Sequence, residues 1–342
     1  MAIINFERTS FHVDAPGMFT TVQDSGRVGY QQFGMPVAGP MDGESYALGQ
    51  ALVGNFEPKG SLECTVLAPT LTLRGNCIVA FTGADMQPTI NHVKVPRYIP
   101  FLCHAGDVIS GGFTQCGMRM YISFSGGIDV PLVNGSVATH TKSKIGGFYG
   151  RPLQVGDTVY LHRVSVTDVT ICRFDDTLHR LFNVALYNRG GRYCHEPFRV
   201  VLGAQSEAFT RDGIEAFGSG LYTLTERCDR MGFRLKGPTI THKIGADIIS
   251  DGAVFGSIQV PADGQPIVLM ADRQTTGGYT KIGTVITPDL PRLSQLPVGD
   301  DIRFHLISVE EGQYLYKEYM SIWQQHMDLA RLQHRYIFDT DC

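Results

Sequence analysis

The sequence predicts a mainly β protein made of twisted sheets or barrels. Three observations carry this prediction. The 342 residues include 39 glycines and 17 prolines, which separate many short runs rich in Val, Ile, Thr, Phe and Tyr. Hydrophobic residues make up 43% of the chain and charged residues 18%, so a large core can form. Stretches in which apolar residues recur at helical spacing are few.

Three Gly-Asp turns indicate an internal repeat. Gly106-Asp107, Gly156-Asp157 and Gly299-Asp300 each lead into an apolar run. Two of them belong to the N-terminal half and one lies near the C-terminus. We therefore expect two related β units, residues 1–187 and 188–342, although Gly-Asp is a common turn pair.

Helical periodicity occurs in three places. Asp42 is expected to cap a helix that ends at residues 54–55. Ser206 is expected to begin a short helix that contains Phe209. The clearest pattern covers residues 310–333, where apolar and aromatic side chains recur on one face. That stripe predicts a packing face against the core or against another protein chain, rather than a cofactor site.

Composition and missing motifs exclude several classes of protein. The net charge is −4 and no basic run exists, which argues against a nucleic-acid partner. No signal peptide and no membrane span are expected, because the N-terminus lacks a cationic lead and no apolar run approaches 18 residues. No compact metal-ligand spacing, phosphate-binding loop or GxSxG elbow is present, so no metal site is expected.

The eight cysteines are scattered without a CxxC pair, which predicts reduced thiols in a cytoplasmic protein. Cys194-His195-Glu196 places a thiol beside a base, but side chains at adjacent positions usually point apart. We therefore do not expect a thiol nucleophile there.

The densest group of polar side chains follows an apolar run of strand length, residues 266–271. An acid, a base, an amide and two hydroxyls stand beside paired glycines that let the backbone curve around a ligand. We predict a ligand site formed by Asp272, Arg273, Gln274, Thr275, Thr276, Gly277, Gly278, Tyr279 and Lys281. The alternative is a hairpin loop in which Asp272 and Arg273 pair only with each other.

Two further segments offer ligand contacts. Gln23, Asp24 and Arg27 supply an acceptor, a carboxylate and a bidentate cation around a tight turn. A solvated turn is the alternative for this segment. Gln259 is expected on a strand that faces the same cleft as Asp272.

Arg230 and Arg234 are four residues apart, which places both on one face of an extended strand. Such a pair can clamp a carboxylate or a phosphate. An edge strand with solvent-facing arginines fits the same spacing.

Taken together, these segments resemble a known family. Residues 22–30 resemble its VQD-GR-GY element, residues 34–42 its G-PVSG-MD element, and residues 229–235 its NRMGYRL segment. Residues 259–266 and 271–281 resemble its IQVP-DGQP and ADRQTTGGYPKI signature. The family is the biotin-dependent carboxyltransferase group, also called allophanate hydrolase subunit 2 or KipA-like. It includes the C subunit of bacterial ATP-dependent 5-oxoprolinase and the carboxyltransferase portion of urea carboxylase. The first is favoured because its chains, like this one, are free-standing, not because of any particular residue.

The resemblance implies two cyclophilin-like β-barrel units, a few helices and a C-terminal helix. It also implies a KipI-like partner, similar to the B subunit of 5-oxoprolinase, and a further protein similar to its A subunit. Three departures are visible: Thr280 stands where proline is usual, residues 134–139 lack the arginine of an LGSRST-like element, and Asp229 replaces asparagine. The missing arginine removes one candidate anion contact and leaves the substrate class open.

Three functions follow from the resemblance. The first is opening of 5-oxoproline to glutamate, with ATP held by the complex. Asp272 would orient water or substrate, while Arg273 and Arg230 would bind anions. The hydroxyls of Thr275 and Thr276 and the backbone N–H groups of residues 277–278 would surround the developing oxyanion.

The second function is transfer of a carboxyl group from carboxybiotin to a urea-like or small amide nitrogen. No biotin-attachment lysine in a Met-Lys-Met setting is present, so another protein would deliver the biotin. Gln23, Gln259 and Gln274 would cradle the ureido ring, and Asp272 or Lys281 would act as base. The third is non-enzymatic, an antagonist that binds a KipI-like kinase inhibitor. In all three cases Asp24, Arg230 and Asp272 are expected to line one cleft.

Overall fold

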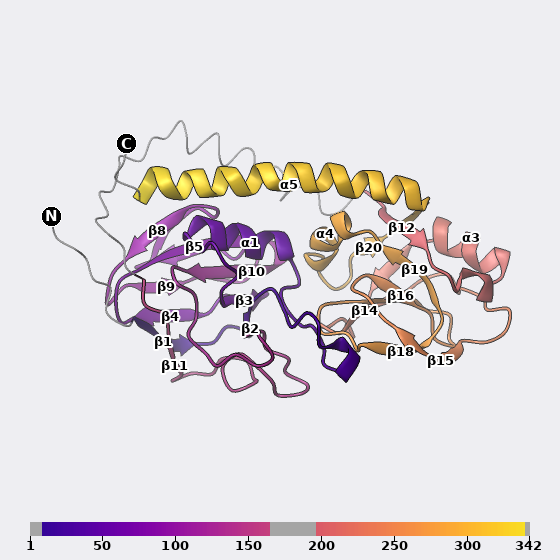
Figure 1. The fold of residues 1–342 in the computed structure, drawn as a ribbon, viewed down its shortest axis with the longest axis horizontal. Coiled ribbons are helices and arrows are strands. Elements are labelled where there is room, and N and C mark those ends of the chain that lie inside the picture. The colour runs from indigo at the N-terminus through magenta and orange to yellow at the C-terminus, as the bar shows by residue number, and fades with distance from the viewer. Residues whose placement is uncertain (1–8, 165–195, 339–342) are drawn as a thin grey trace. The chain divides into compact units, whose positions relative to one another are not determined.

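The computed structural model describes residues 9–164 and 196–338 (Figure 1). The chain divides into two compact units. The first comprises Met1–Gly26, Asp42–Gly191 and Trp323–Cys342, and the second comprises Arg27–Met41 and Arg192–Ile322. The expected division at residues 187 and 188 falls outside the described ranges and stays a prediction, as does the arrangement of Cys194 and His195. The mainly β fold class is confirmed.

The first unit contains two antiparallel sheets. One has the strand order β11-β1-β4-β9-β6-β7, and the other has the order β2-β3-β10-β5-β8. Phe11 and Phe124 stack in the core of this unit, with ring centroids 5.2 Å apart. The strands are β1 (Ser10–Ala15), β2 (Phe19–Gln23), β3 (Ser61–Thr65), β4 (Thr70–Leu73), β5 (Cys77–Asp85), β6 (Thr89–Ile90), β7 (Val93–Lys94), β8 (Pro100–Cys103), β9 (Val108–Ser110), β10 (Cys116–Phe124) and β11 (Thr158–Tyr160).

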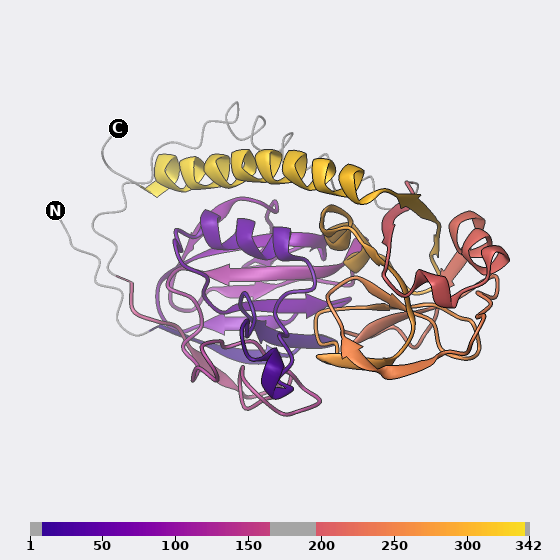
Figure 2. The same ribbon diagram turned by 45° about the vertical axis from the view of Figure 1, so that its right-hand side comes forward.

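Helix α1 (Gly43–Leu52) covers the face of β5 and β10, as Figures 1 and 2 show. The side chain of Asp42 accepts a hydrogen bond from the Ser45 N–H at 3.0 Å, so the predicted cap is confirmed. Gly54 follows the helix in the left-handed region, with a φ of 76°. The sequence signals at the two ends of this helix, Asp42 and Gly54, were sufficient to predict its bounds, because each acts through local contacts.

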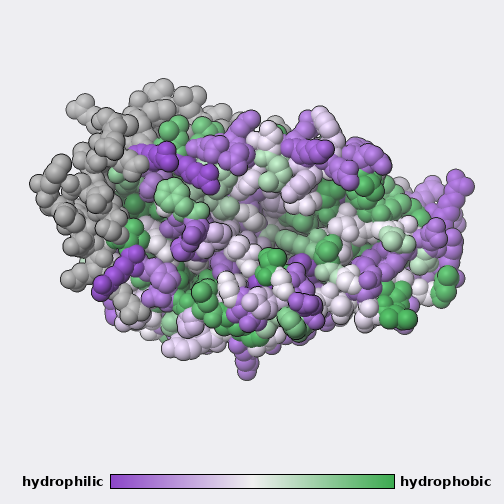
Figure 3. All heavy atoms as spheres, viewed as in Figure 1, coloured by the Kyte–Doolittle hydropathy of each residue, from purple (hydrophilic) through white to green (hydrophobic). Residues whose placement is uncertain are grey.

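The C-terminal helix α5 (Val309–Phe338) is longer than the predicted 310–333. Within the first unit its last turns pack on α1, where Ala330 and Phe338 are buried in a small cluster with Leu48 and Leu52. The visible side of α5 carries hydrophilic side chains with single apolar ones between them (Figure 3). Among the described helices, none combines the length and the apolar character needed to cross a membrane.

The second unit is built on a nearly closed eight-stranded barrel sheet of order β20-β13-β14-β17-β16-β19-β12-β21. Only β12 and β21 pair in parallel among the described strands of this sheet. A separate two-stranded sheet joins β15 and β18. The strands are β12 (Phe198–Leu202), β13 (Tyr222–Leu224), β14 (Gly232–Lys236), β15 (Asp247–Gly252), β16 (Ser257–Gln259), β17 (Ile267–Leu269), β18 (Thr276–Tyr279), β19 (Lys281–Val285), β20 (Asp301–Ile302) and β21 (Phe304–Ile307).

Short helices complete the second unit. A 3-10 turn covers Ser206–Ala208, and Phe209 follows it rather than lying inside it. Helix α3 (Arg211–Ser219), which the sequence did not predict, is capped by the Thr210 side chain. Helix α4 (Leu290–Ser294) follows a 3-10 turn at Thr287–Asp289, and another such turn lies at Gln31–Phe33.

The three Gly-Asp turns share one hydrogen-bond pattern. In each, the glycine N–H donates to a strand residue whose own N–H donates to the aspartate carbonyl. The glycines are all left-handed, with φ between 89° and 94°, a conformation that side chains disfavour. Each turn leads directly into a strand, β9, β11 or β20, as predicted. The strand partners are Leu73, Val13 and Leu224.

Candidate functional site

The sheet formed by β14, β17, β16 and β19 has two faces with different chemistry. Phe233, Val268 and Ile258 are paired across three of these strands, so their side chains share one face. All three belong to the hydrophobic core of the second unit. The neighbouring positions along each strand must therefore point away from that core.

Arg234, Ile267, Gln259 and Lys281 form a row across the four strands on this outer face. Gln259 is nevertheless only 7% exposed. The cover comes from β18, because a Cβ built at Gly277 would overlap the amide nitrogen of Gln259. The strand that carries the glycine pair thus lies directly against the buried amide, which brings the two signature segments together.

The Gln259 amide nitrogen is buried and has no hydrogen-bond partner among the described residues. A buried donor without an acceptor costs about 1–3 kcal/mol, and such groups are rare in folded proteins. The Nε2 atom of Gln259 is therefore a donor that the described residues leave without an acceptor.

Asp272 pairs with Arg230, not with Arg273, so the hairpin alternative is wrong. Arg230 donates from Nε to Asp272 Oδ2 at 3.0 Å and from Nη2 to Oδ1 at 2.8 Å. The same Nη2 donates to the Gly39 carbonyl at 2.6 Å. The side chains are 8% and 5% exposed, and the Asp272 N–H donates to the Arg230 carbonyl at 2.8 Å. The carboxylate expected to orient water and the guanidinium expected to bind an anion hold each other in this structure.

The prediction that Arg230 and Arg234 share one face of a strand is wrong. Arg230 precedes β14 and is buried against Asp272, while Arg234 lies within β14 and is exposed. Even spacing applies only where both residues are in the strand.

Arg273 is half-buried and donates to two backbone carbonyls, from Nε to Ala253 at 3.3 Å and from Nη1 to Met270 at 3.4 Å. Its guanidinium lies 5.7 Å from the ring centre of Phe255. Burial lowers the pKa of Arg273 from its ordinary value. These contacts attach it to the loop that enters β16.

Lys281 at the end of the outer row donates from Nζ to Asp251 at 2.8 Å. Gln205 also donates to that carboxylate at 2.9 Å and accepts from the Lys281 N–H at 2.8 Å. The hydrogen bond from Lys281 lowers the pKa of Asp251.

The other predicted residues of this segment differ in exposure. Gln274 and Thr276 are exposed, Tyr279 is 41% exposed, and Thr275 and Gly278 are half-buried. Their side chains and backbone can therefore meet a ligand from solution.

His242 was not predicted. Its Nε2 lies 3.1 Å from the Val260 carbonyl and 3.0 Å from the Thr280 hydroxyl. A carbonyl only accepts, so Nε2 carries the proton. The Thr280 N–H donates to the Ala246 carbonyl at 2.8 Å, a bond that proline at this position would lack. Thr280, which departs from the family pattern, therefore has hydrogen-bond partners of its own. The sequence did not predict them, because His242 and Ala246 are more than 30 residues from Thr280 along the chain.

Gln23 and Asp24 belong to the first unit. Gln23 is fully buried and donates to the Thr21 hydroxyl and the Thr139 carbonyl, while its Oε1 has no partner among the described residues. Asp24 accepts from the Ser136 hydroxyl at 2.6 Å and the Val137 N–H at 2.7 Å. Ser136 and Val137 lie in the segment 134–139, where the arginine usual in the family is missing. This segment thus donates hydrogen bonds to Asp24.

Arg27 belongs to the second unit and is 1% exposed. The alternative of a solvated turn is therefore wrong for Arg27, whereas its predicted contact with a ligand stays a prediction. Because Asp24 lies in one unit and Arg230 and Asp272 in the other, their convergence on one cleft stays a prediction.

A buried acid in the first unit, Glu63, was also not predicted from the sequence. Glu63 accepts from the Tyr121 hydroxyl at 2.6 Å, and that hydroxyl accepts from the Asp42 N–H at 2.9 Å. Both side chains are at most 1% exposed, and burial raises the pKa of Tyr121. An isolated acid within a strand carries no local signal of its partner.

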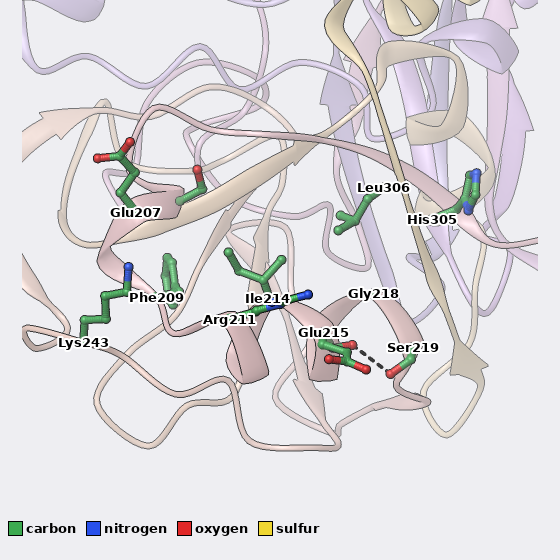
Figure 4. A pocket seen from close by; sticks show the side chains of 11 residues that line it. Glu207, Phe209, Arg211, Ile214, Glu215, Gly218, Ser219, Lys243, His305 and Leu306 are labelled. Carbon is green, nitrogen blue, oxygen red and sulfur yellow. Dashed lines mark hydrogen bonds between the residues drawn. The ribbon is translucent and has the colours of Figure 1, made fainter.

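A recess of about 670 Å³ lies elsewhere on the second unit (Figure 4). Phe209, Ile214 and Leu306 supply its apolar surface. Figure 4 shows Glu207 and Lys243 on one side and His305 on the other. It contains none of the predicted site residues. In the described ranges, no three His, Cys, Asp or Glu side chains are grouped to hold a metal ion.

Comparison with known proteins identifies relatives over most of the chain. The C subunit of 5-oxoprolinase from Escherichia coli (strain K12) is 34% identical over 296 residues, which cover 86% of this chain and 91% of that protein. The Haemophilus influenzae protein of the same name is 32% identical over 86% of this chain and 90% of its own length. Urea amidolyase of Saccharomyces cerevisiae is 28% identical over 96% of this chain, which spans only 18% of that protein.

The crystal structure of Kluyveromyces lactis urea carboxylase superposes with a TM-score of 0.81 at 27% identity. The match covers 93% of this chain and 29% of that chain. Residues 33–306 also match the family described as carboxyltransferase domain, subdomain A and B. This range includes the outer row of the second unit and the buried Arg230–Asp272 pair. The chain therefore belongs to the carboxyltransferase domain family, subdomains A and B.

Proposed function

We propose that this chain is one component of an ATP-dependent 5-oxoprolinase that works with a KipI-like protein and a protein similar to the A subunit of that enzyme. The observation that carries the proposal is the 34% identity to a 5-oxoprolinase C subunit that extends over 91% of that relative. The second unit adds a buried amide donor, a charged lysine and a fixed carboxylate within the same signature segments.

The reaction converts 5-oxoproline, ATP and two water molecules to glutamate, ADP and phosphate. The lactam is a poor electrophile, so its oxygen is first phosphorylated by ATP. One water then adds to the carbonyl carbon, and the C–N bond breaks as the nitrogen gains a proton, which leaves an acyl phosphate. The second water hydrolyses that acyl phosphate and releases phosphate. The protein must stabilise negative charge on the oxygen atoms and hold the substrate in place.

The contacts of each residue indicate which of these tasks it would perform. Gln259 Nε2 and the N–H groups of residues 277–278 would donate to the substrate oxygen, and Lys281 would supply positive charge. The Arg230–Asp272 pair would position the loop that carries Arg273 and Gln274. The complex as a whole would hold ATP.

The test is ATP-dependent glutamate release from 5-oxoproline. We expect no activity from this chain alone and activity from the co-purified complex. Gln259→Leu should lower kcat/KM about 100-fold, the usual effect of losing one donor to a developing oxyanion. Gln115→Leu, at an exposed glutamine of the first unit, is the matched control. Unchanged activity in Gln259→Leu would show that Gln259 is not a donor to the substrate oxygen. If the complex released no glutamate, the proposed 5-oxoprolinase function would be wrong.

A second candidate is biotin-dependent carboxyl transfer to a urea-like or small amide nitrogen. The family description and the urea carboxylase structure favour it. The Gln259 amide nitrogen, which has no partner among the described residues, would donate to the oxygen of a ureido ring. Gln259 and Gln274 would hold it. Carboxybiotin, delivered by another protein, would supply an activated carboxyl group.

This candidate predicts avidin-sensitive incorporation of bicarbonate into a urea-like acceptor. Such incorporation without glutamate release would replace the first proposal. The antagonist of a KipI-like kinase inhibitor stays a prediction. It would be favoured by a stable complex that is silent in both assays.

A further inference from the structure

A second recess of about 620 Å³ lies beside the outer row of the second unit. Its walls are the turn at residues 225–228, strand β14 and the loop at residues 261–266. Arg234, a member of the outer row, lines it together with Ile267. The recess therefore lies on the same sheet face as the buried Gln259 amide.

Three cationic side chains line this recess. Arg234 and Lys236 alternate on β14, so both point away from the core, and Arg227 comes from the facing turn. In the described part of the chain, none of the three forms an ion pair. Two acids also line the recess: Glu226, and Asp263, whose Oδ1 accepts from the Gln265 N–H at 3.1 Å.

The walls of the recess are held in place by hydrogen bonds that involve none of the three cationic groups. The Thr225 hydroxyl and N–H both donate to the Arg234 carbonyl. The Gln265 side chain accepts from the Gly237 N–H at 2.8 Å and donates to the Gly237 carbonyl at 3.2 Å. Pro261, Pro266 and Ile267 form an apolar part of the lining. The site is thus shaped before any ligand arrives.

We propose that this recess binds the phosphate groups of a nucleotide. Unpaired guanidinium and ammonium groups match phosphate oxygens, and the proline and isoleucine surface can contact a flat apolar ring. A bare carboxylate would use fewer of the three cations and none of the apolar lining. The choice of ATP among phosphate-bearing ligands rests on the proposed function, whereas the anion site rests on the recess alone.

Calorimetric titration of the full chain, alone and with its co-purified partners, tests the proposal without turnover. The probes are ATP, tripolyphosphate, adenosine and 5-oxoproline. We expect ATP and tripolyphosphate to bind, adenosine to bind weakly, and the affinity to fall with added salt. Arg234→Gln and Lys236→Gln should each weaken ATP binding roughly tenfold. Arg211→Gln, at an exposed arginine of the other recess, should have no effect.

The outcomes separate the two proposals. Equal ATP affinity in wild type and both β14 variants, or no binding of either phosphate probe, would overturn the site. Binding of tripolyphosphate but not ATP would keep the phosphate site and overturn the nucleotide. If 5-oxoproline bound and neither ATP nor tripolyphosphate did, the recess would be a carboxylate site and the phosphate proposal would be wrong. Glutamate release, measured separately, decides the proposed function whichever result is obtained here.

Discussion

At the scale of single residues, the site depends on how closely β18 approaches Gln259. Gly277 has an ordinary backbone conformation, so its requirement for glycine is steric. A Cβ there would meet the far end of a flexible side chain. The amide can rotate away at small cost in stability, but it would then no longer present Nε2 to a ligand.

Gly277→Ala is therefore expected to lower activity at least about 10-fold while changing the free energy of unfolding by less than about 1 kcal/mol. Gly112→Ala is the matched control, because Gly112 lies outside the predicted site and its new Cβ would have no atom beyond the chain neighbours within 4 Å. Steady-state kinetics and urea unfolding measure the two effects. Equal activity in both variants would show that the Gln259 amide has no role.

The Arg230–Asp272 pair is the most buried ion pair among the described residues of the second unit. Removing one member leaves the other charge buried without its partner, which usually costs about 3–5 kcal/mol. We expect this loss for Arg230→Met in urea unfolding. The double variant with Asp272→Leu should lose less than the single variant, because no charge is then left unpaired.

Arg234→Met on the neighbouring strand is the control and should stay within about 0.5 kcal/mol of wild type, since Arg234 is exposed. A loss of less than about 1 kcal/mol in Arg230→Met would mean that water reaches the Asp272 carboxylate.

At the scale of elements, α5 completes the first unit by covering α1. Ala330 is fully buried in the cluster with Leu48 and Leu52, and His334 Nδ1 lies 2.9 Å from the Leu52 carbonyl at the end of α1. The helical stripe was visible in the sequence, but its partner was not. A stripe shows which face is buried without showing what buries it.

Ala330→Arg is expected to destabilise the first unit by more than about 3 kcal/mol, because a long charged side chain would enter a packed apolar cluster. Leu332→Arg, two residues away and 55% exposed, should change stability by less than about 0.5 kcal/mol. Thermal unfolding compares them. Similar melting temperatures would contradict the packing of α5 on α1.

At the scale of the whole molecule, each unit has its own hydrophobic core. Phe124 is buried in the first core and Phe304 in the second. Because apolar contacts act locally, a cavity in one core should loosen the unit that contains it more than the other.

Phe124→Ala and Phe304→Ala are each expected to cost about 3–5 kcal/mol. Hydrogen exchange followed by mass spectrometry should show faster exchange within the first unit for Phe124→Ala and within the second for Phe304→Ala. Uniformly faster exchange in both variants would show that the two units unfold as one cooperative body.

The sequence alone determined features whose causes are local. The mainly β class follows from short β-branched runs between glycines and prolines, and the helix after Asp42 follows from its cap and its glycine. The Gly-Asp turns follow from a left-handed glycine. The signature at residues 271–281 was also visible, because its polar groups are adjacent in the chain.

Only the tertiary structure decided which of these groups meet. It paired Asp272 with Arg230 across 42 residues, placed Gly277 over Gln259, and gave Thr280 a partner in His242. It also separated Arg230 from Arg234, which spacing had placed together. The physical reason is that hydrogen bonds and close contacts depend on distance in space, which strand pairing sets and local spacing does not.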